Sequence, residues 1–265
     1  MTLLDDDAVD AYLERIKAKR PELPTADALR ELHRQHIFHV PYETVHLHQG
    51  ERLLFGLDAY RKIVHRGRGG TCFELNSPFA ELLRALGFQV DVLASRVFYE
   101  GKLGPLQGHM VLRVVTADSP EPWLADVGYG PGFLHPVRLD SRAEQADPHG
   151  VYQFVDGEYG DIDLVRDGES QYRVDTRPRT DDDFRAMGYY YEHAPDSPPI
   201  VYLYATRATP TGRITIMGDK LTIRSNGEKT KRHLTSEAEL IDEWRTWFGI
   251  ELTWFPPLHP PPIGR

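Results

Sequence analysis

The sequence predicts an α+β fold, with a helical N-terminal part, an antiparallel β-barrel or sheet in the middle and a mixed α/β part at the C-terminus. Two observations predict this order. Apolar residues recur at helical spacing over about the first 86 residues. After Gly87, segments rich in valine and leucine alternate in places with polar residues, and the later ones are separated by glycine and aspartate, a pattern typical of antiparallel strands. The 265 residues are 40% hydrophobic and 27% charged, an ordinary composition for a globular protein.

Charge and cysteine content narrow the possible functions. The 31 basic and 40 acidic residues give a net charge of −9, which argues against a nucleic-acid binder that neutralises phosphates. No apolar stretch reaches the roughly 18 residues of a transmembrane helix, and the acidic N-terminus does not have the pattern of a secretory signal. Cys72 is the single cysteine, so we expect no disulfide, no cysteine zinc site and a cytoplasmic location.

Four helices are predicted in the N-terminal part. Their expected positions are residues 7–19, 25–39, 58–66 and a segment that begins near Cys72. Thr25 and Asp58 are the expected N-caps of the second and third helices, and Pro41 ends the second.

The rest of the chain predicts strands, one further helix and a tail. The expected strands of the middle part are residues 88–99, 109–116, 122–127, 152–154, 162–165 and 172–175. A hairpin over 213–217 and 220–225 continues through the turn Asn226–Gly227 into a strand over 228–233. Ser236 and Glu239 form a capping box for a helix that Gly249 ends. Five prolines between Pro256 and Pro262 predict an extended or disordered end.

Cys72 has the local context of a nucleophile. Thr71 and Glu74 fit a capping box, which places Cys72 at the first position of a helix, where unpaired N–H groups and the helix dipole favour a thiolate. Gly69 and Gly70 precede it, and because they lack a Cβ atom, a substrate carbonyl can approach the backbone closely. The alternative is a buried cysteine beside an ordinary helix cap.

The start of this helix is ambiguous. Ser77 and Pro78 also have the pattern of an N-cap followed by the first helical residue. Pro78 inside a longer helix would remove one hydrogen bond. Either the helix bends at Pro78 or the turn at Cys72 is short.

His109 and Asp126 are the expected partners of Cys72. A cysteine nucleophile needs a base, and the base needs a group that orients it. His109 begins the apolar run HMVLRVV, and Asp126 follows the next apolar run, so adjacent strands would place both at one end of the sheet. A carboxylate there is costly to bury without a partner, and a histidine N–H is a natural one. The alternative for Asp126 is a solvated turn residue before Gly128.

These motifs together resemble the arylamine N-acetyltransferase family. The resemblance rests on RGRGGTCFELN, then GHMVLRV, then LADVGYG, with a spacing of 37 residues from Cys72 to His109 and 17 from His109 to Asp126. The upstream stretch LHRQHIFHVPYETV is also similar to the family's pattern. The match covers residues 29–131 well. The rest of the chain resembles the family only in the order of its predicted helices and strands.

The resemblance implies a three-part fold and a ping-pong reaction. The helical domain would span residues 1–86, the β-barrel domain 87–185, the α/β lid 186–255 and the proline-rich tail 256–265, with a core like that of cysteine proteases and transglutaminases. Cys72 would take an acyl group from a thioester, usually acetyl-CoA, and pass it to an arylamine or hydrazine. His109 would be its partner and Asp126 the orienting group.

Seven further residues are assigned to substrate binding. The resemblance carries over the acceptor-site positions Tyr42, Val97, Tyr129 and Gly130. Gly70 is assigned because it permits close approach to the backbone, and Gly108 because it precedes His109. Arg68 belongs to a local basic cluster with Arg61, Lys62 and Arg66, which could steer CoA or a phosphopantetheine; the alternative is a solvated helix face.

Several positions depart from the family pattern. The changed positions in this chain are Tyr42, Thr44, Tyr129 and the Pro199–Ile200 pair. They lie where the family has its acyl and acceptor pocket, so an alternative is an amide synthase that releases a polyketide chain from an acyl carrier protein onto an aromatic amine, with macrolactam formation. A thioesterase or cysteine hydrolase would use the same triad, and a non-enzymatic binding module is the remaining class.

No permanent cofactor or metal is predicted. Five histidines lie between His33 and His48, but no cysteine supports a metal site there, and the stretch matches the family's helix and loop. The expected donor is acetyl-CoA or a carrier-protein thioester, and the expected acceptor is a small arylamine.

Overall fold

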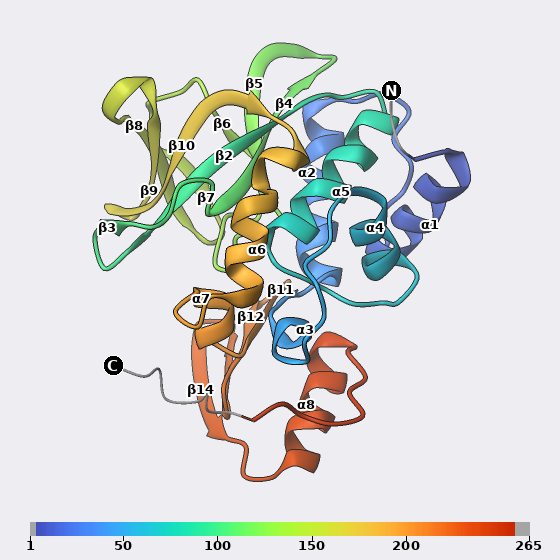
Figure 1. Cartoon of the computed structure of the whole chain (residues 1–265). Helices are drawn as coiled ribbons and strands as arrows, with labels where there is room; N and C mark the ends of the chain where they lie inside the picture. Colours follow the sequence, from blue (N-terminus) through green and yellow to red (C-terminus); the bar gives the residue numbers. More distant parts are fainter. Residues whose placement is uncertain (1–3, 258–265) are drawn as a thin grey trace.

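The computed structural model describes residues 4–257, which form an α+β fold (Figure 1). The N-terminal part is helical, as predicted. Its helices are α1 (Asp6–Ile16), α2 (Ala26–His39), α3 (Val45–His48), α4 (Gly56–Val64) and α5 (Cys72–Ala85). None of the helices within residues 4–257 is both long and apolar enough to cross a membrane.

The helices α1 and α2 begin at side-chain caps. Asp5 accepts a hydrogen bond from the Ala8 amide, and Thr25 accepts one from the Ala28 amide at 3.3 Å, which confirms Thr25 as an N-cap. α1 ends three residues before the predicted boundary because Lys17 adopts a left-handed conformation, with φ of 56°.

The predicted N-cap of the third helix is wrong. α4 begins at Gly56 rather than after Asp58, and the Ser77 hydroxyl accepts the hydrogen bond of the Gly56 amide at 2.8 Å. Because Ser77 belongs to α5, this cap could not be predicted from the residues next to α4. Asp58 lies in the first turn of α4, where its charge still favours the helix dipole.

The helix α5 runs without interruption from Cys72 to Ala85. The capping box of Thr71 and Glu74 is present, and Pro78 lies inside the helix, so a start at Ser77 is wrong. Pro78 removes one backbone hydrogen bond. Most of the α5 side chains are buried, and α5 packs against strands of the central sheet, so tertiary burial offsets this local cost.

Nine antiparallel strands form the curved, barrel-like middle of the molecule. Their order is β6-β5-β4-β2-β10-β9-β8-β7, with β3 paired to β2. The strands are β2 (Gln89–Tyr99), β3 (Lys102–Leu103), β4 (His109–Thr116), β5 (Ser119–Ala125), β6 (Val137–Arg138), β7 (Gln145–Asp147), β8 (Gly150–Asp156), β9 (Ile162–Arg166) and β10 (Glu169–Arg179). Two short 3-10 helices follow β8 and β10, η1 (Glu158–Gly160) and η2 (Asp181–Phe184).

A second antiparallel sheet has the order β1-β11-β12-β13-β14. Its strands are β1 (Tyr42–Glu43), β11 (Tyr204–Thr209), β12 (Gly212–Met217), β13 (Lys220–Ser225) and β14 (Glu228–His233). The helices of this part are α6 (Arg185–His193), α7 (Pro198–Val201) and α8 (Glu237–Phe248). The predicted strands over 220–225 and 228–233 and the helix between Ser236 and Gly249 are confirmed.

The strand β1 joins distant parts of the chain. Tyr42 pairs with Thr206 of β11 and forms a parallel bridge with Gly70, two residues before Cys72. The start of α5, the segment after α2 and the second sheet therefore meet at one place. The division into domains at residues 86, 185 and 255 stays a prediction, and most of the predicted tail, residues 258–265, lies outside the described part of the chain.

Candidate active site

His109 and Asp126 meet at one end of the central sheet, as the sequence predicts. His109 is the first residue of β4, and Asp126 directly follows β5, its antiparallel neighbour. The start of one strand therefore lies beside the end of the other. The His109 Nε2 and Asp126 Oδ2 atoms are 2.7 Å apart, and both side chains are buried.

Cys72 faces this pair from the N-terminus of α5. Its side chain forms a hydrogen bond with His109, and because Asp126 engages Nε2, Nδ1 is the ring nitrogen left for the sulfur. Burial lowers the pKa of His109, but the charges of Asp126 and Cys72 and their hydrogen bonds outweigh it and raise that pKa to about 10. The site therefore favours an imidazolium between a carboxylate and the sulfur.

Asn76 supports the carboxylate and was not singled out by the sequence analysis. Its amide donates to Asp126 Oδ1 at 2.9 Å and to the Met110 carbonyl at 2.8 Å, and its oxygen accepts from the Val127 amide at 3.0 Å. Asn76 lies four residues after Cys72 on α5, so both side chains point to the same face of the helix. The sequence feature that could have identified Asn76 is its position at the end of the CFELN motif.

Asp126 is kept ionised although it is fully buried. Burial raises its pKa, but His109, Asn76 and the Gly128 amide, which donates to Oδ1 at 2.9 Å, outweigh burial and hold the pKa below its ordinary value. His33 accepts a hydrogen bond from the Asp126 backbone amide at 3.1 Å. Burial lowers the pKa of His33 to about 4, so this ring is neutral and fits an acceptor role.

The other histidines of the N-terminal part also have structural partners. His36 contacts the Tyr12 hydroxyl at 3.1 Å, and His46 lies between two glutamates. Within residues 4–257, no three or more His, Cys, Asp or Glu side chains are grouped as metal ligands.

A cavity of about 340 Å³ opens onto Cys72 and His109. Of the residues assigned to substrate binding, Tyr42, Val97, Gly108, Tyr129 and Gly130 line it. The lining also includes all the family departures except Ile200, namely Tyr42, Thr44, Tyr129 and Pro199. Four further tyrosines that the sequence analysis missed belong to it, Tyr99, Tyr191, Tyr202 and Tyr204. The lining contains no aspartate, glutamate, lysine or arginine, so the cavity is an aromatic, largely uncharged space.

Aromatic rings enclose the histidine. The Tyr129 and Tyr172 rings lie 5.5 and 5.2 Å from the His109 ring, and 5.1 Å from each other. Tyr172 comes from β10, a strand whose sequence gave no functional signal. These rings exclude water from the His109–Asp126 contact and so strengthen it.

Arg68 and Gly70, which were assigned to substrate binding, are not part of the lining of the cavity. Arg68 forms ion pairs with Glu43 at 3.0 Å and with Glu51 at 3.6 Å. A Cβ atom on Gly70 would approach the Glu74 carboxylate to 2.7 Å, so this glycine makes room for a side chain of the protein itself.

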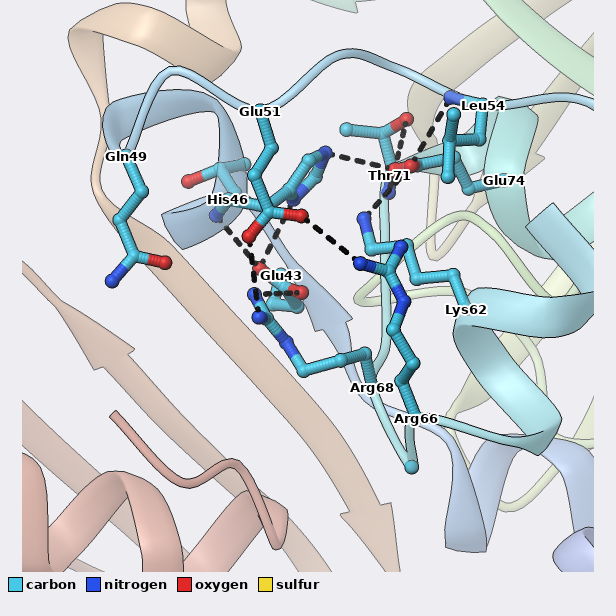
Figure 2. A network of polar contacts seen from close by, with 12 residues as sticks. Glu43, His46, Gln49, Glu51, Leu54, Lys62, Arg66, Arg68, Thr71 and Glu74 are labelled. Atoms are coloured by element: carbon cyan, nitrogen blue, oxygen red, sulfur yellow. Dashed lines mark hydrogen bonds and ion pairs between the residues drawn. The ribbon is translucent and has the colours of Figure 1, made fainter. Parts of the chain in front are cut away.

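Glu74 is the centre of a buried charge network (Figure 2). It contacts Lys62 at 2.7 Å and His46 at 2.9 Å, and it accepts the Thr71 amide at 3.0 Å. Burial raises the pKa of Glu74, but His46 and Lys62 outweigh burial and lower it to about 2. Glu43 contacts His46 from the other side at 3.2 Å. This network, Arg68–Glu43–His46–Glu74–Lys62, fixes the turn that precedes Cys72.

The network divides the predicted basic cluster. The Lys62 side chain is fully buried and that of Arg68 is 14% exposed, whereas Arg61 and Arg66 are at least half exposed. A solvated helix face therefore describes only Arg61, since Arg66 is exposed but follows the end of α4.

Comparisons with known proteins identify the family of this chain. A family model described as N-acetyltransferase matches residues 25–255. The arylamine N-acetyltransferase of Escherichia coli K12 is 31% identical over 249 residues, which cover 90% of this chain and 87% of that protein. The arylamine N-acetyltransferase of Mycobacterium bovis is 30% identical, with 91% and 89% covered.

Solved structures give the same result. The arylamine N-acetyltransferase of Mycobacterium marinum in complex with CoA superposes with a TM-score of 0.85 at 29% identity, covering 91% of this chain and 92% of that one. The Nocardia farcinica enzyme superposes with a TM-score of 0.84 at 32% identity, covering 94% and 90%. This chain belongs to the arylamine N-acetyltransferase family.

Proposed function

We propose that this protein transfers an acetyl group from acetyl-CoA to an arylamine through a thioester on Cys72. The observation that carries the proposal is the line of Cys72, His109 and Asp126 at the edge of the aromatic cavity. The names of the Escherichia coli and Mycobacterium bovis relatives and the CoA complex of the Mycobacterium marinum enzyme support this donor and acceptor class.

The arrangement gives each side chain a chemical role. With His109 protonated, Cys72 acts as a thiolate, attacks the thioester carbonyl and expels the CoA thiolate, which takes the proton from His109. The neutral imidazole then accepts a proton from the arylamine as its nitrogen attacks the acyl group on Cys72. The new amide leaves, and the Cys72 thiolate and His109 imidazolium are restored. Asp126 holds the ring in place and stabilises its charged form in both half-reactions.

The lining of the cavity favours an uncharged aromatic acceptor. No carboxylate, ammonium or guanidinium group lines it, so a charged substituent on the amine would lose its hydration without gaining a partner. Tyr42 and Tyr129 line the cavity, so their hydroxyl groups can form hydrogen bonds with polar substituents such as a phenol.

Mass spectrometry of the intact protein tests the proposal. Mixing with acetyl-CoA should add one acetyl group, located on Cys72, and a later addition of aniline or an aminophenol should remove it and yield the acetylated amine. Cys72→Ala should show neither adduct nor product. An adduct that discharges to water as fast as to the amine would indicate a thioesterase instead. An adduct that persists in Cys72→Ala would contradict the proposal.

A further inference from the structure

Three consecutive tyrosines of α6, Tyr189 to Tyr191, have different surroundings. Successive residues of an α-helix point about 100° apart, so these three side chains cannot share one face. Tyr189 is 66% exposed and Tyr190 is half-buried. Tyr191 is buried and lines the cavity that Cys72 and His109 also line. Tyr191 is therefore the residue of this run that α6 directs toward the reacting groups.

The Tyr191 hydroxyl is bound to the residue that precedes the histidine. It donates a hydrogen bond to the Gly108 carbonyl oxygen at 2.5 Å. Gly108 comes directly before His109, the first residue of β4, so this carbonyl belongs to the peptide unit through which the chain enters the strand. Because a peptide unit is planar, holding its carbonyl also restricts the direction in which the His109 side chain leaves the backbone.

The Tyr191 ring packs beside the nucleophile. It is stacked on the ring of Phe73, the residue after Cys72, with the centroids 5.6 Å apart and the planes inclined by 21°. Burial and then the nearby charge of Cys72 raise the pKa of the Tyr191 phenol, so the hydroxyl keeps its proton. One side chain thus contacts the neighbour of the nucleophile through its ring and the neighbour of the base through its hydroxyl.

The position of Tyr191 is itself fixed by the protein. Its backbone carbonyl accepts a hydrogen bond from the buried Ser197 hydroxyl at 3.1 Å. The carboxylate of the next residue, Glu192, accepts the hydrogen bond of the Leu53 amide at 2.6 Å. These contacts tie α6 to the turn that follows it and to the segment before α4, so the Tyr191 hydroxyl is oriented before any substrate enters the cavity.

We propose that Tyr191 is a positioning residue for His109. Its hydroxyl holds the peptide unit that precedes His109, which keeps the imidazole in line with Asp126 and Cys72. This inference rests on the proposed function. A phenol has one hydrogen to donate, and the Gly108 carbonyl takes it, so Tyr191 does not donate to the sulfur or to an acyl oxygen. Its effect belongs to the rate of acylation rather than to the binding of the donor.

Tyr191→Phe tests this role because it removes only the hydroxyl and keeps the ring on Phe73. The matched control is Tyr190→Phe, on the same helix. It removes a hydroxyl that donates to Asp196 at 3.2 Å and that lies outside the lining of the cavity. The measurement is single-turnover acylation of Cys72 at a series of acetyl-CoA concentrations, followed by mass spectrometry. It gives the maximum rate, the half-saturating concentration and the final amount of adduct.

Tyr191→Phe should lower the maximum rate of acylation by about 10–100-fold, because a misplaced base reacts slowly. The half-saturating concentration of acetyl-CoA should stay within about twofold of the wild-type value, since no contact with the donor is removed. The final amount of adduct should also be unchanged, whereas a loss of folded protein would reduce it. Tyr190→Phe should match the wild-type protein in all three quantities.

The pH profile of the maximum rate gives a second measurement. Burial lowers the pKa of His109, but Asp126 and Cys72 outweigh burial and raise it to about 10. A ring that is less well aligned with these partners has a pKa closer to the ordinary 6.5. The rate of Tyr191→Phe should therefore begin to fall at a lower pH than the wild-type rate. A tyrosine that only stabilises the fold would not move this alkaline limb.

A wild-type maximum rate in Tyr191→Phe, or a slower rate with an unmoved alkaline limb, would overturn the proposal. A higher half-saturating concentration at an unchanged maximum rate would also overturn it and would make Tyr191 a contact of the donor. If acetyl-CoA does not acylate the wild-type protein, the proposed function fails, which is a distinct result. Alkylation of Cys72 by iodoacetamide needs no donor and should then still be slower in Tyr191→Phe than in Tyr190→Phe, because the thiolate depends on an aligned imidazolium. Equal alkylation rates would contradict the role of Tyr191.

Discussion

His109 holds its charge because two different neighbours favour the proton. Asp126 contacts one ring nitrogen at 2.7 Å and Cys72 engages the same ring, within a site closed by Tyr129 and Tyr172. The carboxylate is itself fixed by Asn76. A single hydrogen-bonded chain therefore runs from α5 through Asp126 and His109 back to α5.

Asp126→Asn should reduce the rate of Cys72 acylation by about 10³–10⁴-fold, because an amide cannot stabilise the imidazolium and can hold the ring in the wrong tautomer. Single-turnover acylation followed by mass spectrometry measures this. Asp140→Asn, which changes a surface carboxylate paired with Arg138, is the control and should leave the rate unchanged. A rate within tenfold of the wild-type rate in Asp126→Asn would show that the carboxylate does not orient the base.

The raised pKa of His109 also makes stability depend on pH. The ordinary pKa of 6.5 rises to about 10 in the fold, so the contribution is complete below pH 6.5 and is lost as the pH rises to about 10. The comparison uses Cys72→Ala, so that the effect of Asp126 on His109 is measured without the sulfur. Urea unfolding at pH 6 and pH 9.5 should show a larger loss of stability in Cys72→Ala than in Cys72→Ala/Asp126→Asn. Equal losses would mean that Asp126 does not raise this pKa.

For single residues, the sequence predicted a role where a local pattern or a motif marks the residue. Cys72, His109 and Asp126 are marked by a capping box, a strand start and a buried charge. Tyr172 approaches His109 because β10 pairs with β2, where Tyr172 lies opposite Val97, 75 residues earlier in the chain. The sequence around Tyr172 contains no motif that predicts this contact. Arg68 was placed with substrate on the basis of charge, but its carboxylate partner Glu43 lies on a distant segment.

At the scale of elements, the position of Cys72 depends on what surrounds the first turn of α5. The Glu74 carboxylate ties the Thr71 amide to Lys62 of α4 and to His46 of α3. From the opposite side, a Cβ atom on Gly128 would come within 2.6 Å of the Cys72 Cα atom, so only glycine lets this loop pass. The nucleophile is thus held between a charge network and a close backbone contact.

Glu74→Gln should lower the free energy of unfolding by about 3–5 kcal/mol, because it leaves the Lys62 ammonium buried without a counter-charge. Lys62→Met/Glu74→Gln removes both charges and should be less destabilised than the sum of the two single variants. The measurement is a double-mutant cycle by urea unfolding. If the loss of stability in the double variant equals the sum of the losses in the two single variants, the two charges do not interact.

The elements were predicted well where one periodic pattern runs through them. β4 has the predicted bounds because its apolar run is continuous. α8 follows its predicted N-cap Ser236, whose side chain accepts from the Glu239 amide, but the Glu239 carboxylate accepts from the Thr235 amide, so the second half of the predicted capping box does not form. β1 contains two residues and exists only because β11 lies beside it, so no pattern of its own marks it. α4 was misplaced because its cap, Ser77, belongs to a helix that follows later in the chain.

Over the whole molecule, Arg207 joins the first and last helical parts. From β11 it donates to the Phe38 carbonyl at the end of α2 at 2.6 Å and to the Trp247 carbonyl at the end of α8 at 2.7 and 2.9 Å. Cations are favourable at helix C-termini, where carbonyl groups lack partners. One half-buried guanidinium thus connects two helices that are 198 residues apart at their nearest ends.

Arg207→Met should destabilise the protein by about 2–4 kcal/mol, since it leaves carbonyl groups at two helix ends without donors. Amide hydrogen exchange should also speed up in α8 more than in α5, because the C-terminal part loses its tie to α2. Arg232→Met is the comparison and should change little, because Arg232 is a half-exposed residue of β14 whose ion pairs with α8 lie at the surface. Uniform acceleration across both helices would argue for a purely global effect.

The pairing of Tyr42 with Thr206 has a consequence during synthesis on the ribosome. The wall of the cavity needs residues as early as Tyr42 and as late as Met217, so it cannot close until β12 has been made. A nascent chain that already carries Cys72, His109 and Asp126 therefore holds the reacting groups without the chamber around them. A truncated chain that ends before β11 should therefore not react with acetyl-CoA. We expect activity to appear only after β12 has been translated.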